Sequence, residues 1–141
     1  MNKLGYWFLV FVGVLMVFMM GYNIYQTFYP FKTIEIENAD NLTVLTPRVK
    51  AGEDLVYHFK YCRFFKGGVK VYRNLIGPER IPTSITESSA LPGCREVDSH
   101  LNVPESAKSG TYHMEASAEF DINPQRLIRV DYKTEDFEVY E

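Results

Sequence analysis

The pattern of apolar and polar residues changes once along this chain, close to residue 30. Residues 4–31 contain no charged side chain, and residues 4–21 are almost wholly apolar. A helix rises about 1.5 Å per residue, so 18 or 19 apolar residues span roughly the 30 Å thickness of a bilayer's hydrocarbon core. Aromatic residues that favour the headgroup layer follow this stretch: Tyr22, Tyr25, Phe28 and Tyr29. Residues 1–30 are therefore predicted to form a transmembrane signal-anchor helix with a juxtamembrane aromatic belt.

Three other interpretations fit this segment less well. A cleaved signal peptide needs small residues at its cleavage site, whereas this apolar run ends in bulky ones (MMGYNIYQTFYP). A core helix of a soluble protein would present a polar face to water, and this segment has none. A pilin-like helix carries Glu at the fifth position after its cleavage glycine, but Val10 holds that position after Gly5. We therefore expect an anchor that is not cleaved.

The remainder of the chain alternates between apolar and polar residues with the period of two that is typical of strands. Gly, Pro, Asn and Asp turns separate these stretches, and none shows the pattern of an amphipathic helix. The expected strands lie at residues 33–37, 54–64, 69–74 (after a turn at Gly67-Gly68), 112–120, 127–133 and 137–139, with weaker ones at 42–49, 81–86 and 97–103. This number of short strands predicts one antiparallel β-sandwich over residues 31–141.

A family resemblance agrees with this fold class. Residues 104–112 (PESAKSGTY) resemble the approach to the penultimate strand of immunoglobulin-like and fibronectin-like domains, and residues 50–55 (KAGEDL) resemble the turn into their second strand. In such domains a tyrosine near the strand start forms a tyrosine corner, a role that the resemblance implies for Tyr112. Met114 holds the place of the antibody-type cysteine, and the only tryptophan is Trp7. The resemblance thus implies an all-β, immunoglobulin-like antiparallel β-sandwich preceded by one transmembrane α-helix, and no functional residue.

The two cysteines, Cys62 and Cys94, both lie in the predicted sandwich. An even number of cysteines behind an anchor favours an oxidising compartment, so we expect a disulfide between them. The alternative is a pair of unlinked thiols in a cytoplasmic domain. Only Lys3 precedes the helix, while several basic residues follow it, and that distribution alone would favour a cytoplasmic C-terminal domain. The short N-terminal tail and the cysteines favour the opposite topology, which we expect: a periplasmic or extracellular domain.

No motif of catalysis, metal binding or cofactor binding is recognisable. The chain contains neither a G-x-S-x-G elbow nor a phosphate-binding glycine loop, and no C-x-x-C pair that would lower a thiol pKa. His58, His100 and His113 have no spacing typical of metal ligands. We therefore expect no metal, no cofactor and no enzymatic activity.

Charge distribution gives the remaining indication of function. Residues 60–80 contain six basic side chains and one acid, Glu79, with aromatic residues interleaved. Such a hairpin could bind anionic lipid headgroups, a glycan or an acidic partner; the alternative is a solvated face with the aromatics in the core. The net charge of −3 argues against nucleic-acid binding. The candidate binding surface consists of Arg63, Lys66, Lys70 and Arg73.

Architecture and the lack of catalytic motifs together predict a non-enzymatic function. We expect a single-pass, membrane-anchored interaction or assembly module whose partners are the lipid bilayer and a protein in the same membrane or envelope. The alternative is a membrane-tethered ligand-binding receptor or inhibitor domain that uses loops within residues 63–93, chiefly a long loop at residues 75–93. An enzyme with dispersed catalytic groups is a third hypothesis.

Overall fold

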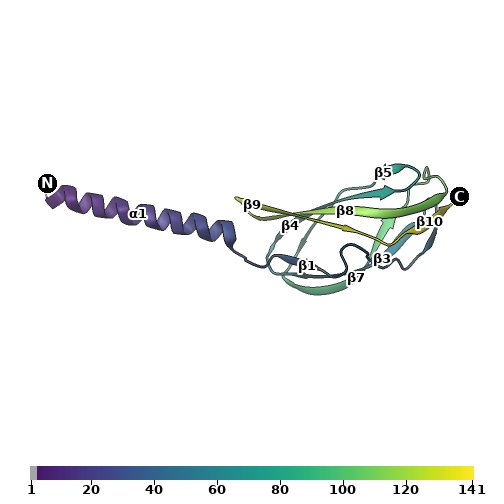
Figure 1. Cartoon of the computed structure of the whole chain (residues 1–141), viewed down its shortest axis with the longest axis horizontal. Helices are drawn as coiled ribbons and strands as arrows, with labels where there is room; N and C mark the ends of the chain where they lie inside the picture. Colours follow the sequence, from purple (N-terminus) through teal and green to yellow (C-terminus); the bar gives the residue numbers. More distant parts are fainter. Residues whose placement is uncertain (1–2) are drawn as a thin grey trace. The chain divides into compact units, whose positions relative to one another are not determined.

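The computed structural model describes residues 3–141 and forms two compact units, which divide between Lys32 and Thr33 (Figure 1). The first unit contains α1 (Lys3–Phe28), a helix of 26 residues with no buried side chain. Within residues 3–141, α1 is the one helix long and apolar enough to cross a membrane. Its length is about 39 Å at 1.5 Å per residue. The predicted N-terminal apolar helix is confirmed.

Polar side chains near the C-terminal end of α1 bond to the backbone of the helix itself. Asn23 Nδ2 donates to the carbonyl of Met19, and Thr27 Oγ1 donates to the carbonyl of Asn23, both at 2.8 Å. Such bonds satisfy polar groups without a partner outside the helix, which an apolar environment requires.

The second unit, residues 33–141, is built from strands. They are β1 (Ile34–Ile36), β2 (Arg48–Lys50), β3 (Asp54–Arg63), β4 (Gly67–Ile76), β5 (Arg80–Pro82), β6 (Thr86–Ala90), β7 (Gly93–Asn102), β8 (Gly110–Asn123), β9 (Arg126–Lys133) and β10 (Phe137–Tyr140).

These strands form two sheets, which we call the two-sheet domain. The smaller sheet has the order β1-β3-β7 and is antiparallel throughout. The larger has seven strands: the path β2-β10-β8-β4-β5, with β6 paired to β4 and β9 paired to β8. All its pairs are antiparallel except β2 with β10, which is parallel. Figure 1 shows β1, β3 and β7 in one layer and β4, β5 and β8 in the other.

Both sheets contribute to one hydrophobic core. Leu55 and Tyr57 on β3 and Leu101 on β7 are buried from the smaller sheet. Alternate residues of β8 are buried from the larger sheet, as the predicted period of two requires: Tyr112, Met114, Ala116, Ala118 and Phe120. The predicted all-β unit after the helix is therefore confirmed as two packed sheets.

Three local expectations were wrong. Gly67 and Gly68 do not form the turn but open β4; a Cβ on Gly67 would lie 2.6 Å from the carbonyl oxygen of Asp121, so this glycine permits close backbone approach to β8. Of residues 42–49, Leu42 and Val44 form only isolated bridges, and a short strand begins at Arg48.

The third expectation concerned residues 75–93, which are not one long loop. They contain β5 and β6, and β6 pairs with β4 in a register that sets Thr86 opposite Val71. β6 carries small polar residues and is exposed along residues 86–89, so it lacks the alternation that reveals a half-buried strand.

The predicted disulfide is present. Cys62 on β3 and Cys94 on β7 are bonded and lie directly opposite each other in the register of these two strands. The bond therefore connects neighbours within the smaller sheet and does not bridge the two sheets, as the antibody-type disulfide does.

Tyr112, for which the resemblance implies a tyrosine corner, is fully buried. Within the described part of the chain its hydroxyl has no hydrogen bond of ordinary geometry. The pKa of Tyr112 is raised by burial and by the nearby Glu79, whereas the backbone of Lys108, four residues upstream, lowers it. The hydroxyl thus faces the upstream backbone, and the tyrosine corner itself stays a prediction.

Replacing Cys62 and Cys94 together with serine is expected to lower the free energy of unfolding. The bond joins residues 32 apart, and closing a loop of that size in the unfolded chain is worth roughly 3–4 kcal/mol on the chain-entropy model. Urea denaturation of the full chain in lipid nanodiscs, followed by circular dichroism, measures the change. Reduction of the wild type should produce a similar loss. Equal midpoints with and without reductant would contradict a structural role for the bond.

Candidate functional site

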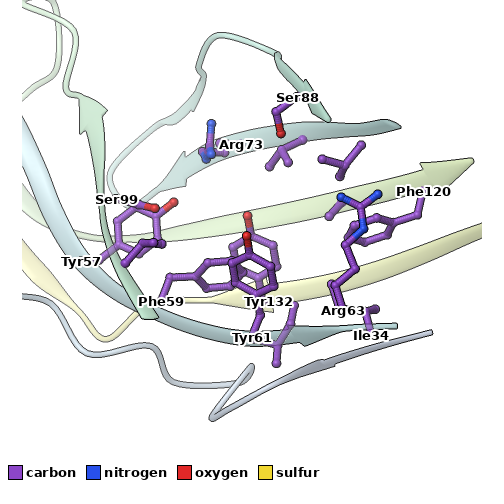
Figure 2. Close-up of a pocket in the computed structure, with 15 residues that line it drawn as sticks. Ile34, Tyr57, Phe59, Tyr61, Arg63, Arg73, Ser88, Ser99, Phe120 and Tyr132 are labelled. Atoms are coloured by element: carbon purple, nitrogen blue, oxygen red, sulfur yellow. The ribbon is translucent and has the colours of Figure 1, made fainter. Parts of the chain in front are cut away.

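A cavity of about 160 Å³ lies between the two sheets. Side chains from β1, β3 and β7 line it on one side, and side chains from β4, β6, β8 and β9 line it on the other. Protein cores contain few voids larger than a water molecule, so a cavity of this size in a small domain is the first candidate for a site. Figure 2 shows its lining.

The smaller sheet supplies an aromatic wall. Tyr57, Phe59 and Tyr61 alternate along β3 and all face the cavity, as their spacing predicts. The ring centre of Phe59 lies 5.1 Å from that of Tyr61 and 5.1 Å from that of Tyr132, which reaches across from β9. These contacts connect the aromatic side chains of the two sheets into one cluster (Figure 2).

Small and branched side chains on the opposite wall leave the space open. Val69 and Val71 on β4 face the cavity together with Ala118 on β8. Ala118 lies between Val71 and Val130 in the register of β4, β8 and β9. The short side chains of Val69, Val71 and Ala118 therefore leave a gap that faces the β3 aromatics, beside the ring of Tyr132.

Arg63 is the most unusual residue of the lining, because it is charged and only 2% exposed. Its guanidinium carbon lies 4.4 Å from the ring centre of Phe65 and 5.6 Å from that of Phe120, at cation–π distance. Nη2 donates to the carbonyl of Gly67, but Nε is buried and has no acceptor within residues 3–141. Burial lowers the pKa of Arg63, and the nearby Tyr61 partly opposes this.

Arg73 brings a second guanidinium to the same cavity from β4. Its Nη1 donates to Thr86 Oγ1 on β6 at 2.7 Å, while its Nε, like that of Arg63, is buried without an acceptor in the described residues. The pKa of Tyr132 is raised well above its usual range, chiefly by burial and further by Tyr57, and Arg73 partly opposes the increase. Arg73 and two phenol hydroxyls therefore influence one another electrostatically inside the domain.

The structure divides the candidate binding surface predicted from the sequence. Arg63 and Arg73 both line the inter-sheet cavity, whereas Lys66 and Lys70 are exposed and do not line it. Lys70 Nζ forms an exposed ion pair with Glu87 at 3.2 Å. Four basic residues that are close in sequence are thus separated by strand alternation into an interior pair and an exterior pair.

Sequence reasoning missed part of the site although the signal was present. Arg63 occupies the same phase as Tyr57, Phe59 and Tyr61, and Arg73 the same phase as Val69 and Val71. A charged residue in the apolar phase of a strand indicates a buried charge, and buried charges often serve function. Tyr132 was assigned to a strand but not to a site, because only the tertiary fold brings β9 opposite β3.

The lining is suited to binding an anion. Arg63 and Arg73 offer only hydrogen-bond donors, and tyrosine and serine hydroxyls, including those of Tyr132 and Ser99, can also donate. No Asp or Glu is among the described residues that line the cavity. Two positive charges in an apolar enclosure without a carboxylate create a positive potential that water screens weakly.

A second cluster of titratable groups lies elsewhere on the smaller sheet. His58 Nδ1 is 2.9 Å from Asp98 Oδ1, and its Nε2 is 3.0 Å from Glu96 Oε1. The hydrogen bond with Asp98 is the main cause that raises the pKa of His58; burial opposes the increase, and the charges of Glu96 and Asp98 add to it. Within residues 3–141 no group of three His, Cys, Asp or Glu side chains is arranged to hold a metal ion.

Two substitutions of Arg63 separate the effect of its charge from that of its volume. Arg63→Met keeps an unbranched chain without the buried charge, so the free energy of unfolding is expected to change by less than about 1 kcal/mol. Arg63→Ala also removes the packing against Phe65 and Phe120 and should cost about 2–4 kcal/mol. Urea denaturation of both variants of the full chain checks this. Equal losses in the two variants would show instead that the guanidinium itself stabilises the fold.

Comparisons with known proteins identify no family. No family model matches the chain, and no curated protein sequence matches it. Among solved structures it is similar to alkylpurine DNA glycosylase AlkC of Pseudomonas fluorescens bound to DNA containing an abasic site analog (11% identity, TM-score 0.44, covering 78% of this chain and 31% of that one). It is also similar to the sporulation control protein Spo0M of Bacillus subtilis (8% identity, TM-score 0.42, covering 78% and 50%).

A β-glucosidase of Listeria innocua in complex with gluconolactone is similar over 77% of this chain and 16% of its own, at 11% identity and a TM-score of 0.37. This chain therefore spans half or less of the length of each of these three proteins. Likenesses at these scores carry no argument about function. The comparisons and the structure together support a β-sheet domain that follows an N-terminal apolar helix and has only distant structural similarity to known proteins.

Proposed function

We propose that this chain is a membrane-anchored, extracytoplasmic, non-enzymatic binding module. In this proposal α1 is a single-pass signal anchor, and the two-sheet domain is an immunoglobulin-like β-sandwich that holds a small ligand between its sheets. The observation that carries the proposal is the inter-sheet cavity, which contains two buried or half-buried arginines and no carboxylate among the described residues that line it.

The anchor and the compartment rest on two properties of the chain. α1 presents apolar side chains on all sides and none is buried, which suits a helix in lipid better than one in water. Cys94 of the Cys62–Cys94 disulfide is exposed, so thiol reductants can reach the bond. A disulfide that thiol reductants can reach persists in an oxidising compartment and not in the cytosol.

The immunoglobulin-like assignment is supported by two packed sheets and by the buried Tyr112 at the start of β8. The fold departs from antibody-type domains in the parallel pairing of β2 with β10 and in a disulfide that stays within one sheet. The proposal therefore concerns the arrangement of the sheets and transfers no binding residue from that family.

Ligand binding is favoured over catalysis by the kind of groups that line the cavity. Guanidinium and hydroxyl donors orient and neutralise an anion, while aromatic and branched side chains enclose an apolar body. Arginine is fixed in its protonated state, so it binds without exchanging protons.

An assembly module is the second candidate, and the free edges of two strands favour it. Within residues 33–141, β6 pairs only with β4, and β7 pairs only with β3. Residues 86–89 of β6 and 93–98 of β7 are exposed. An exposed strand edge can receive a strand from a partner protein.

The anchor is tested by placing charge in the middle of α1. Val14→Arg with Val17→Arg is expected to move the chain from the membrane pellet to the soluble fraction, because each central arginine costs roughly 2.5–3.5 kcal/mol of insertion. Val14→Leu with Val17→Leu is the matched control and should stay in the membrane after carbonate extraction.

The side of the membrane on which the domain lies is tested separately. A protease added outside intact cells or spheroplasts should remove a C-terminal tag from the wild type. A protected tag would place the domain in the cytoplasm and contradict the proposal.

Ligand binding is tested with a variant that fills the cavity. Native mass spectrometry of the full chain, released from its membrane in mild detergent, should show a bound small molecule in the wild type. Ala118→Leu narrows the cavity and should remove that molecule while the protein still unfolds cooperatively. A stoichiometric protein partner that is retained in Ala118→Leu, with no small molecule in the wild type, would reject this function in favour of the assembly module.

A further inference from the structure

We infer that the inter-sheet cavity binds a small organic monocarboxylate whose apolar body is about the size of one aromatic ring, with its carboxylate held by the guanidinium of Arg63 or of Arg73. This inference rests on the proposed function and names the chemical class of its ligand. It follows from the charge, the donors and the volume of the cavity, taken in turn.

The charge of the ligand follows from the unbalanced charge of the lining. Arg63 is nine-tenths buried or more and lines the cavity, and buried charges are normally paired. The described lining contains no acidic side chain. An anion beside either guanidinium would supply a missing partner.

The unused donors of both guanidiniums point to the same conclusion. A guanidinium has five N–H donors, and Nε of Arg63 and Nε of Arg73 are each buried without an acceptor in the described chain. Buried polar atoms without a partner are rare in native structures. The protein therefore leaves the hydrogen-bonding capacity of both arginines incomplete, and a carboxylate matches the planar fork of a guanidinium.

The aromatic and aliphatic walls determine the rest of the ligand. Phe59, Val71 and Ala118 line the cavity with apolar surface, which does not replace the hydration of a phosphate or sulfate. Hydroxyls of Tyr132 and Ser99 add a few donors among these walls. A monocarboxylate with an apolar body matches this mixture better than an inorganic anion.

The volume limits the size of that body. The cavity measures about 160 Å³, and a protein cavity of about 150 Å³ lined by apolar side chains accommodates benzene. One aromatic ring or a short acyl chain therefore fits, whereas a long lipid chain does not.

The ligand can enter where β6 and β7 border the cavity. Ser88 on β6 and Val97 on β7 both line the cavity and both are exposed. These two strands are not paired with each other, so this side has no backbone hydrogen bonds to close it. Entry at this edge does not require the core to open.

The test is isothermal titration calorimetry of the full chain in lipid nanodiscs, with empty nanodiscs as the blank. Benzoate, phenylacetate and hexanoate are the probes; benzamide is the neutral analogue of benzoate, and acetate is the anion without an apolar body. At least one of the three probes should bind with one site per chain. Benzamide and acetate should bind at least about 10-fold more weakly than that probe, since charge-assisted hydrogen bonds or apolar burial are lost.

Variants show which arginine holds the carboxylate. Of Arg63→Met and Arg73→Gln, the variant that removes the guanidinium holding the carboxylate should weaken the binding of that probe by about 10- to 100-fold. Lys50→Gln, which removes an exposed charge outside the cavity, should leave the affinity unchanged. Circular dichroism and the unfolding midpoint of each variant show that any loss of binding is not a loss of fold.

Three outcomes would overturn the inference. These are no binding of any of the three carboxylates, binding of benzamide as tight as that of benzoate, and unchanged affinity in both arginine variants. If a neutral or cationic molecule is found with the native protein and disappears in Ala118→Leu, the proposed function stands and only the carboxylate assignment fails. If Ala118→Leu changes neither the binding of the probes nor the amount of any co-purified molecule, both the carboxylate assignment and the proposed function fail.

Discussion

Strand β8 is the constraint on which the two-sheet domain depends. It pairs with β4 along one edge and with β10 and then β9 along the other, so it holds together four strands of the larger sheet. Its alternate residues also supply much of the core, from Tyr112 to Phe120. Because pairing and burial act on the same fourteen residues, β8 cannot shift in register without exposing the core and breaking three strand pairs at once.

The same strand explains why the domain contains a cavity. The buried face of β8 begins and ends with large side chains, Tyr112 and Phe120, but carries Ala116 and Ala118 between them. On the other side of the cavity, β3 presents the rings of Tyr57, Phe59 and Tyr61. On the β8 side the cavity is therefore bounded by a short side chain, Ala118, next to the large ring of Phe120.

Local alternation in the sequence is sufficient to predict which residues turn inward. The inner faces of β3, β4 and β8 agree with the expected phases, and so does the pairing of Cys62 with Cys94. Alternation fails at exposed edge strands such as β6, where both faces are polar. It also fails to reveal the cavity, because the distance between Ala118 and the rings of β3 depends on how two sheets pack and not on either strand alone.

Register connects the disulfide to the cavity. Cys62 and Arg63 are neighbours on β3, so their side chains point to opposite faces of the smaller sheet: the first meets Cys94, and the second enters the cavity. A slip of one residue between β3 and β7 would reverse every side chain of the slipped strand. If β3 moved, Arg63 would leave its place against the rings of Phe65 and Phe120 and turn to water, where a charged group is more stable. The covalent bond between two residues that face each other across the strands forbids that slip. A disulfide between a half-buried and an exposed cysteine thereby keeps a costly charge inside the core.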